Sequence, residues 1–196
     1  MKILIDNGHG ENTPGKCSPD GRLKEWAYTR EIADKIILEL RKKGMDAERI
    51  VKEMVDVPLS ERCRRANAIY KETAGNAMLV SIHCNAAGSG ADWLTARGWS
   101  VFVSNNASNN SKNLAVCLVK AANARGAYVR QPMPGQMFWM QNLAICRDTN
   151  CPAILTENFF QDNKEDVDFL LSDEGKQMVV QIHVDGIMDY LNKNRR

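Results

Sequence analysis

The sequence lacks a long hydrophobic run and a strong charge of either sign. No segment approaches the 18 or more consecutive apolar residues that predict a membrane-spanning helix. Among 196 residues, 26 Lys and Arg balance 24 Asp and Glu, which leaves a formal net charge of +2. A nucleic-acid-binding domain usually carries a marked basic excess, so this balance argues against a nucleic-acid partner. We therefore expect a globular protein. Because its overall charge is small, the binding of a substrate should depend on a local groove.

The six cysteines are not arranged as metal ligands. None of them forms a CxxC pair, which argues against a structural zinc of the finger or ribbon type. A chain of this length also needs no disulfide scaffold. We therefore predict reduced thiols packed as small hydrophobic groups. Cys84 is expected in the core, because it follows His83 and adjacent side chains of a strand point to opposite faces.

The N-terminus carries no pattern of a secretion signal. Lys2 precedes a short apolar run that Asp6 interrupts at once, so a hydrophobic signal core is missing. We expect a protein that is cytoplasmic until it is released. If a signal has been removed from the chain, the expected compartment is the periplasm or the extracellular space.

Strand and helix patterns alternate along the chain. Apolar β-branched runs predict strands, and apolar residues at helical spacing predict helices. Strands are expected at residues 2–6, 45–51, 76–83, 98–104 and 152–156, and helices at residues 25–43, 60–73, 109–124 and 172–193. This order predicts an α/β fold, with one domain over residues 1–196 and a twisted, mostly parallel β-sheet flanked by helices on both faces.

Smaller features accompany these elements. Ser60 or a neighbour is the expected N-cap of the second helix, and Gly44 ends the first. Residues 126–151 are expected to be irregular, and the basic residues 193–196 are expected at a solvated helix end.

Two histidines and two glutamates stand beside the predicted strands and the first helix. His9 and His83 lie at strand ends, Glu157 follows the last strand, and Glu25 ends the long loop before the first helix. Functional sites of open α/β sheets gather at the carboxyl ends of the strands. The fold could therefore bring these four side chains together.

This set of side chains suits a catalytic zinc ion. Two histidines and one glutamate are a known ligand set that leaves a position for water, whose pKa the metal lowers to about 7. A second carboxylate could then act as general base and return the proton to a leaving nitrogen. Each residue also has an ordinary structural alternative, and the spacing does not say which glutamate is the ligand. His183, in the middle of an apolar helix, is expected to be structural.

Five motifs together resemble one enzyme family, the zinc-dependent N-acetylmuramoyl-L-alanine amidases of the amidase-3 type. Residues 6–10 read DNGHG, like the family's D-x-G-H-G, and Glu25 matches its G-x-x-E element. Leu59, Arg62 and Asn67 are similar to its L-x-x-R and A-N helix. Residues 81–86 read SIHCNA and residues 152–160 read PAILTENFF, which resemble two family strands.

The resemblance implies a site and a reaction. It implies that His9, Glu25 and His83 hold one zinc ion per chain, and that Glu157 activates the water on the metal. The implied reaction is hydrolysis of the amide between the lactyl group of N-acetylmuramic acid and the L-alanine of the stem peptide. The expected partner is peptidoglycan or a muropeptide, and the protein is expected to be a monomer that acts on the cell wall like a phage lysin.

The sequence departs from the family pattern near the predicted catalytic residue. Thr156 and Asn158 replace apolar residues, and Phe159 stands where glycine is common. Residues 127–148 show little family pattern; they could line a substrate groove or pack against the core. Two alternative functions remain: a zinc peptidase or deacetylase acting on cell-wall fragments, and a non-catalytic module that binds muropeptides.

Overall fold

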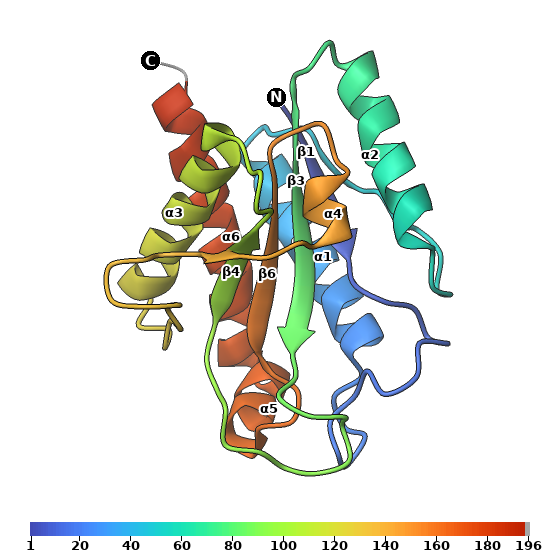
Figure 1. The fold of residues 1–196 in the computed structure, drawn as a ribbon, viewed down its shortest axis with the longest axis vertical. Helices are drawn as coiled ribbons and strands as arrows, with labels where there is room; N and C mark the ends of the chain where they lie inside the picture. Colours follow the sequence, from blue (N-terminus) through green and yellow to red (C-terminus); the bar gives the residue numbers. More distant parts are fainter. Residues whose placement is uncertain (195–196) are drawn as a thin grey trace.

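The computed structural model describes residues 1–194 as a six-stranded sheet between two layers of helices (Figure 1). The sheet consists of β1 (Lys2–Asn7), β2 (Ala47–Arg49), β3 (Ala77–Asn85), β4 (Ser100–Val103), β5 (Trp139–Met140) and β6 (Ala153–Phe160). Its strand order is β2-β1-β3-β6-β4-β5. Only the β4–β6 pair is antiparallel among the described strands. The expected α/β fold with a mostly parallel sheet is confirmed.

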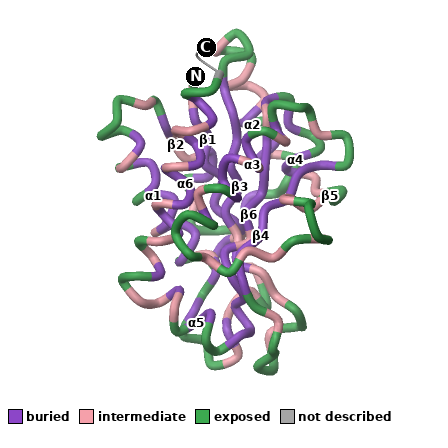
Figure 2. Tube along the Cα trace, turned by 90° about the vertical axis from the view of Figure 1, so that its left-hand side faces the viewer, coloured by how far each residue is buried: buried purple, intermediate pink, exposed green. Residues whose placement is uncertain are grey.

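Alternating side chains give the sheet two hydrophobic faces. In β1, Ile3 and Ile5 belong to one core cluster while Leu4 belongs to the other, as the two-residue period of a strand requires. Figure 2 shows the strands buried in the centre and exposed segments concentrated in the outer loops. Both faces therefore need a covering layer of helices.

The helices divide between the two faces. Helices α1 (Glu25–Lys42), α3 (Asn109–Ala124) and α6 (Asp173–Asn194) supply the larger core cluster. Helices α2 (Leu59–Glu72) and α4 (Ala144–Arg147) cover the other face, in front of the sheet in Figure 1. Helix α5 (Lys164–Leu171) follows β6. None of the helices within residues 1–194 is both long and apolar enough to span a membrane.

Several boundaries differ from the sequence-based expectations. The N-cap of α2 is Pro58, two residues before Ser60, and it makes no side-chain cap bond of the kind expected from Ser60 or a neighbour. Helix α5 was missed because it has only eight residues. The stretch expected to be irregular contains β5 and the single-turn α4, which are too short to show a periodic pattern. Arg195 and Arg196, within the expected basic helix end, lie outside the described residues.

The parallel strands bring the candidate residues to one end of the sheet. β1 and β3 run in register up to the pair Asn7 and Ile82, and β3 pairs with β6 so that His83 lies opposite Glu157. The residues after these strands thus meet at the carboxyl edge, where open α/β sheets form their sites.

Candidate metal centre

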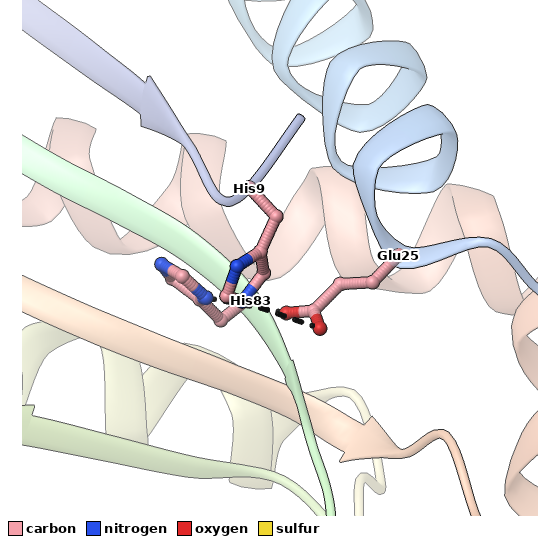
Figure 3. A group of neighbouring side chains, drawn as sticks. All are labelled: His9, Glu25 and His83. Carbon is pink, nitrogen blue, oxygen red and sulfur yellow. Dashed lines mark hydrogen bonds and ion pairs between the residues drawn. The ribbon is translucent and has the colours of Figure 1, made fainter. Parts of the chain in front are cut away.

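His9, Glu25 and His83 converge on one point, as Figure 3 shows. One potential ligand atom from each residue lies within 4.8 Å of the other two. His9 Nε2 is 3.4 Å from Glu25 Oε2, and His83 Nδ1 is 3.2 Å from Glu25 Oε1. The three residues come from the loop after β1, the first turn of α1 and the end of β3.

The donor types are those that bind zinc. Ligand atoms bound to zinc at its usual distances are ~3.3 Å apart, and the two histidine–glutamate separations, each to a different oxygen of Glu25, are close to this value. Glu25 is fully buried, and within residues 1–194 no hydrogen bond reaches its Oε2. A buried carboxylate oxygen without a hydrogen-bond donor is unfavourable. A cation between these side chains would give Glu25 Oε2 the partner that it lacks.

The protonation states of His9 and Glu25 also suit ligands. Burial lowers the pKa of His9 to about 4, which keeps its ring neutral and a nitrogen lone pair available. Burial opposes the ionisation of Glu25, but the His83 hydrogen bond and the two imidazole rings outweigh it and lower the pKa of the carboxyl. Burial likewise opposes protonation of His83, yet its contact with Glu25 raises the pKa of the ring.

Backbone bonds hold Glu25 in place. Its Oε1 accepts the backbone N–H of Cys84 at 2.9 Å, and its own N–H donates to the carbonyl of Lys16 at 3.0 Å. The Cys84 side chain is buried in the core, as expected, while its main chain serves the site. All six cysteines are free thiols, and all except Cys17 are buried.

Close backbone approaches explain two glycines in residues 6–10. A Cβ on Gly8 would lie 2.4–2.8 Å from the ring atoms of His83, and a Cβ on Gly10 would lie 1.9 Å from the Asp56 nitrogen. A side chain at either position would force its neighbours to shift. His9, between them, has a φ of 60°, a left-handed conformation that is unfavourable for a residue with a Cβ.

A buried ionic network supports the loop that carries His9. Asp6 is fully buried and accepts hydrogen bonds from Arg62 Nη1 at 2.7 Å and from Ser81 Oγ at 2.6 Å. Arg62 also pairs with Asp56 at 2.8 Å and donates to the carbonyl of Asn7. In the sequence Arg62 stands out only as part of a motif. In the structure it links β1, α2 and the His9 loop.

Glu157 lies beside the three potential ligands but is not part of their group. It is the cross-strand neighbour of His83 and shares its face of the sheet. Burial raises the pKa of Glu157 to about 7. Within residues 1–194 no hydrogen bond reaches its Oε2. A carboxyl group with a pKa near neutrality is suited to accept and donate protons.

A cavity of about 370 Å³ opens in front of these residues. The cavity is lined by polar and by apolar side chains. The polar ones are Asp6, His9, Lys16, Asp56, Arg62, His83 and Glu157, and the apolar ones are Val57, Leu59, Leu143, Ala144, Ile145 and Leu155. Residues 143–145 belong to the stretch with little family pattern, so part of that stretch does line a groove. Other parts, such as Met137 and Phe138, pack against the core.

Lys16 also lines the cavity, although no sequence pattern marks it. It lies in a long loop with no periodic pattern, and only its position in the cavity distinguishes it from other surface lysines. Its positive charge acts on both His9 and Glu157. The loop's length and the lack of any predicted element in it were the available signals.

Thr156 and Asn158, which depart from the family pattern next to Glu157, form their hydrogen bonds inside the protein. Thr156 Oγ1 lies 2.9 Å from His183 Nε2, and His183 Nδ1 lies 2.7 Å from the Val179 carbonyl. A carbonyl only accepts, so Nδ1 carries the proton and Nε2 accepts from Thr156. Asn158 donates to the His83 carbonyl and accepts from Trp99. His183 is fully buried and structural, as expected.

Comparisons with known proteins agree with this geometry. Residues 3–189 match the family described as N-acetylmuramoyl-L-alanine amidase. The chain is 27% identical over 195 residues to the endolysin of Bacillus phage SPP1, covering 99% of this chain and 67% of the relative. It is 25% identical to the probable cell wall amidase LytH of Staphylococcus saprophyticus, covering 97% of this chain and 58% of that relative.

Solved structures share the fold. The catalytic domain of CwlV, an amidase from Bacillus (Paenibacillus) polymyxa var. colistinus, superposes with a TM-score of 0.80 at 25% identity. That match covers 98% of this chain and 99% of the other. An amidase from Clostridium difficile 630 gives a TM-score of 0.82 at 25% identity, covering 98% and 97%.

Proposed function

The chain belongs to the N-acetylmuramoyl-L-alanine amidase family, and we propose that it is a zinc enzyme that cleaves peptidoglycan. The bond it hydrolyses is the amide between the lactyl group of N-acetylmuramic acid and the L-alanine of the stem peptide. The observation that carries this proposal is the convergence of His9, Glu25 and His83 beside Glu157, in a chain that matches the family over residues 3–189.

His9, Glu25 and His83 would hold one zinc ion. Two imidazoles and one carboxylate form a known catalytic zinc set. Zinc held there would polarise the scissile carbonyl and lower the pKa of a bound water molecule to about 7. The buried Glu25 would keep its orientation through the Cys84 N–H, as second-shell partners of metal ligands do.

Glu157 would move the proton. Its carboxylate would accept a proton from the attacking water while the water oxygen bonds to the carbonyl carbon. It would then donate that proton to the L-alanine nitrogen as the C–N bond breaks. The products are a lactyl carboxylate on the glycan and a stem peptide with a free amino terminus.

The cavity next to the site would bind the substrate. Its apolar lining residues, which include Leu143 and Ile145, suit the methyl groups that flank the scissile amide. Lys16 adds a positive charge to the lining, and the reaction develops negative charge on the carbonyl oxygen. We propose that the protein acts on the cell wall as a monomer; light scattering after size exclusion would measure its mass.

Digestion of purified muropeptides, analysed by mass spectrometry, tests the proposal. We expect an intact stem peptide that begins at L-alanine, no product after treatment with a chelator, and restored cleavage when zinc is added back. Cuts within the stem peptide would indicate a peptidase, and release of acetate would indicate a deacetylase. Binding without cleavage at full zinc occupancy would indicate a binding module.

A further inference from the structure

The backbone carbonyl of His9 is held by two arginines. Arg30 Nη1 donates to it at 3.0 Å, and Arg62 Nη2 donates at 3.3 Å. His9 is in the left-handed conformation, with a φ of 60°. Left-handed backbone at a residue with a Cβ persists only when surrounding contacts hold it, and these bonds are candidates for that role.

Arg30 is the less expected of the two. It is 5% exposed, and within residues 1–194 it forms no ion pair with a carboxylate. All of its hydrogen bonds go to backbone carbonyls, namely those of His9, Trp26, Glu53 and Met54. Burial and the nearby charge of Arg62 lower the pKa of Arg30. A buried cation without an anionic partner is costly, so its retention calls for a reason.

The bonds of one nitrogen supply that reason. Arg30 Nη1 donates both to the His9 carbonyl and to the Trp26 carbonyl, the latter at 2.9 Å. Trp26 directly follows Glu25 in the first turn of α1. One guanidinium nitrogen therefore ties the backbone of His9 to the backbone next to Glu25.

Arg30 Nη2, the second terminal nitrogen of the guanidinium, binds a segment that contacts the loop carrying His9. Arg30 Nη2 donates to the Glu53 carbonyl at 2.8 Å, in the segment between β2 and α2. That segment also lies against the His9 loop, because the Glu11 N–H donates to the Met54 carbonyl at 2.9 Å. Arg62 cannot replace this link, since its shorter bonds go to Asp6 and Asp56.

We propose that Arg30 is a positioning residue of the metal centre, which sets the distance and direction of the His9 imidazole relative to the Glu25 carboxylate. This inference rests on the proposed function only in that the three side chains bind zinc. Second-shell partners of metal ligands typically change metal affinity by about 10–100-fold when they are mutated. Arg30 acts on the backbone of the ligand, and the same range is expected here.

Arg30→Met and Arg30→Lys test the role, with Arg41→Met as matched control. Methionine keeps the apolar stem and removes every donor, whereas lysine keeps the charge without the planar fork. Arg41 lies on the same helix and donates to the Ala47 carbonyl at 3.0 Å, away from the site. Each variant is measured for zinc affinity by chelator competition, for the visible spectrum with Co²⁺, and for melting temperature with and without zinc.

The expected result separates positioning from general stability. Arg30→Met should weaken zinc binding about 10–100-fold, shrink the rise in melting temperature caused by zinc, and alter the Co²⁺ spectrum. Arg30→Lys should weaken binding less, and Arg41→Met should bind zinc like the wild type.

Unchanged zinc affinity in Arg30→Met, with equal losses of melting temperature in the two states, would overturn the inference. If Arg30→Met does not fold, wild-type zinc affinity and Co²⁺ spectrum in Arg30→Lys would overturn it. Failure of the wild-type chain to bind zinc would instead contradict the proposed function.

Discussion

The imidazole of His83 occupies the space where a side chain on Gly8 would lie. A Cβ built on Gly8 is 2.4 Å from His83 Cε1 and 2.5 Å from Nδ1, distances that real atoms do not reach. His83 lies in β3, and Gly8 lies in the loop that follows the adjacent parallel strand β1. The Gly8 N–H donates to the Ile82 carbonyl. The position of the His83 ring therefore requires glycine at residue 8.

Gly8→Ala should disrupt the metal centre. The added methyl group must displace the His83 ring or the β1 loop, so we expect zinc affinity to fall by at least about tenfold together with stability. Gly44→Ala is the control, because Gly44 has a φ of 76° but nothing within 4 Å of an added Cβ. Gly44→Ala should lower the free energy of unfolding by about 1 kcal/mol and leave zinc binding unchanged. Equal zinc affinity in the two variants would contradict this account.

Activity should decline on the acid side of neutrality. Burial raises the pKa of Glu157 to about 7, and a base must be ionised to accept a proton. The positive charge of Lys16 favours the ionised carboxylate, so Lys16→Met should move the acidic limb of kcat/KM to higher pH. Lys24→Met, on the exposed start of α1, should not move it. A limb that stays in place in Lys16→Met would show that Lys16 does not act on Glu157.

Stability should fall as the pH drops from about 6.5 to 4, in part because of His183. Burial lowers the pKa of His183 to about 4, whereas the unfolded residue titrates near 6.5. Between these values the unfolded chain binds the extra proton, so the stabilisation present above pH 6.5 is lost on acidification, by about 3 kcal/mol in total. Urea unfolding of His183→Gln across this range should show a flatter pH dependence. The same slope in both proteins would refute the assignment.

Phe159→Gly should destabilise the protein although it relieves strain. Phe159 has a φ of 64°, which explains why glycine is common at this position in the family. Its ring is buried and contacts Phe169 edge-on, with centroids 5.2 Å apart. Loss of the ring outweighs the relieved strain, and we expect a net cost of about 2–4 kcal/mol.

A control for that substitution comes from another strained residue. Ala74 has a φ of 51° and is exposed. Ala74→Gly relieves strain without losing packing, so it should be neutral or stabilising by up to about 1 kcal/mol in thermal unfolding. A stabilised Phe159→Gly variant would mean that the ring contributes less than its burial indicates.

The sequence predicted the sheet and its main helices because their periodic patterns are long. The predicted last strand ended at Thr156. In the structure β6 continues to Phe160, because Thr156 and Asn158 bond inside the protein with His183 and Trp99. Such pairing between distant residues leaves no mark in a local pattern.

The sequence also predicted the four candidate site residues, but not what supports them. Spacing alone left the roles of Glu25 and Glu157 open, and only the family resemblance assigned them. In the structure Glu25 lies between the two histidines while Glu157 lies beside them. No sequence pattern marks Arg30, because its role depends on carbonyls from three separate segments.

The most direct test of the zinc amidase account is one paired measurement on Glu157→Gln. Zinc content and cleavage of a muropeptide are measured on the same preparation, with wild type alongside. We expect about one zinc per chain in both proteins and loss of turnover by at least about a hundredfold in the variant, because the substitution removes the proton acceptor and leaves His9, Glu25 and His83 intact. Wild-type turnover in Glu157→Gln at full zinc occupancy would contradict it.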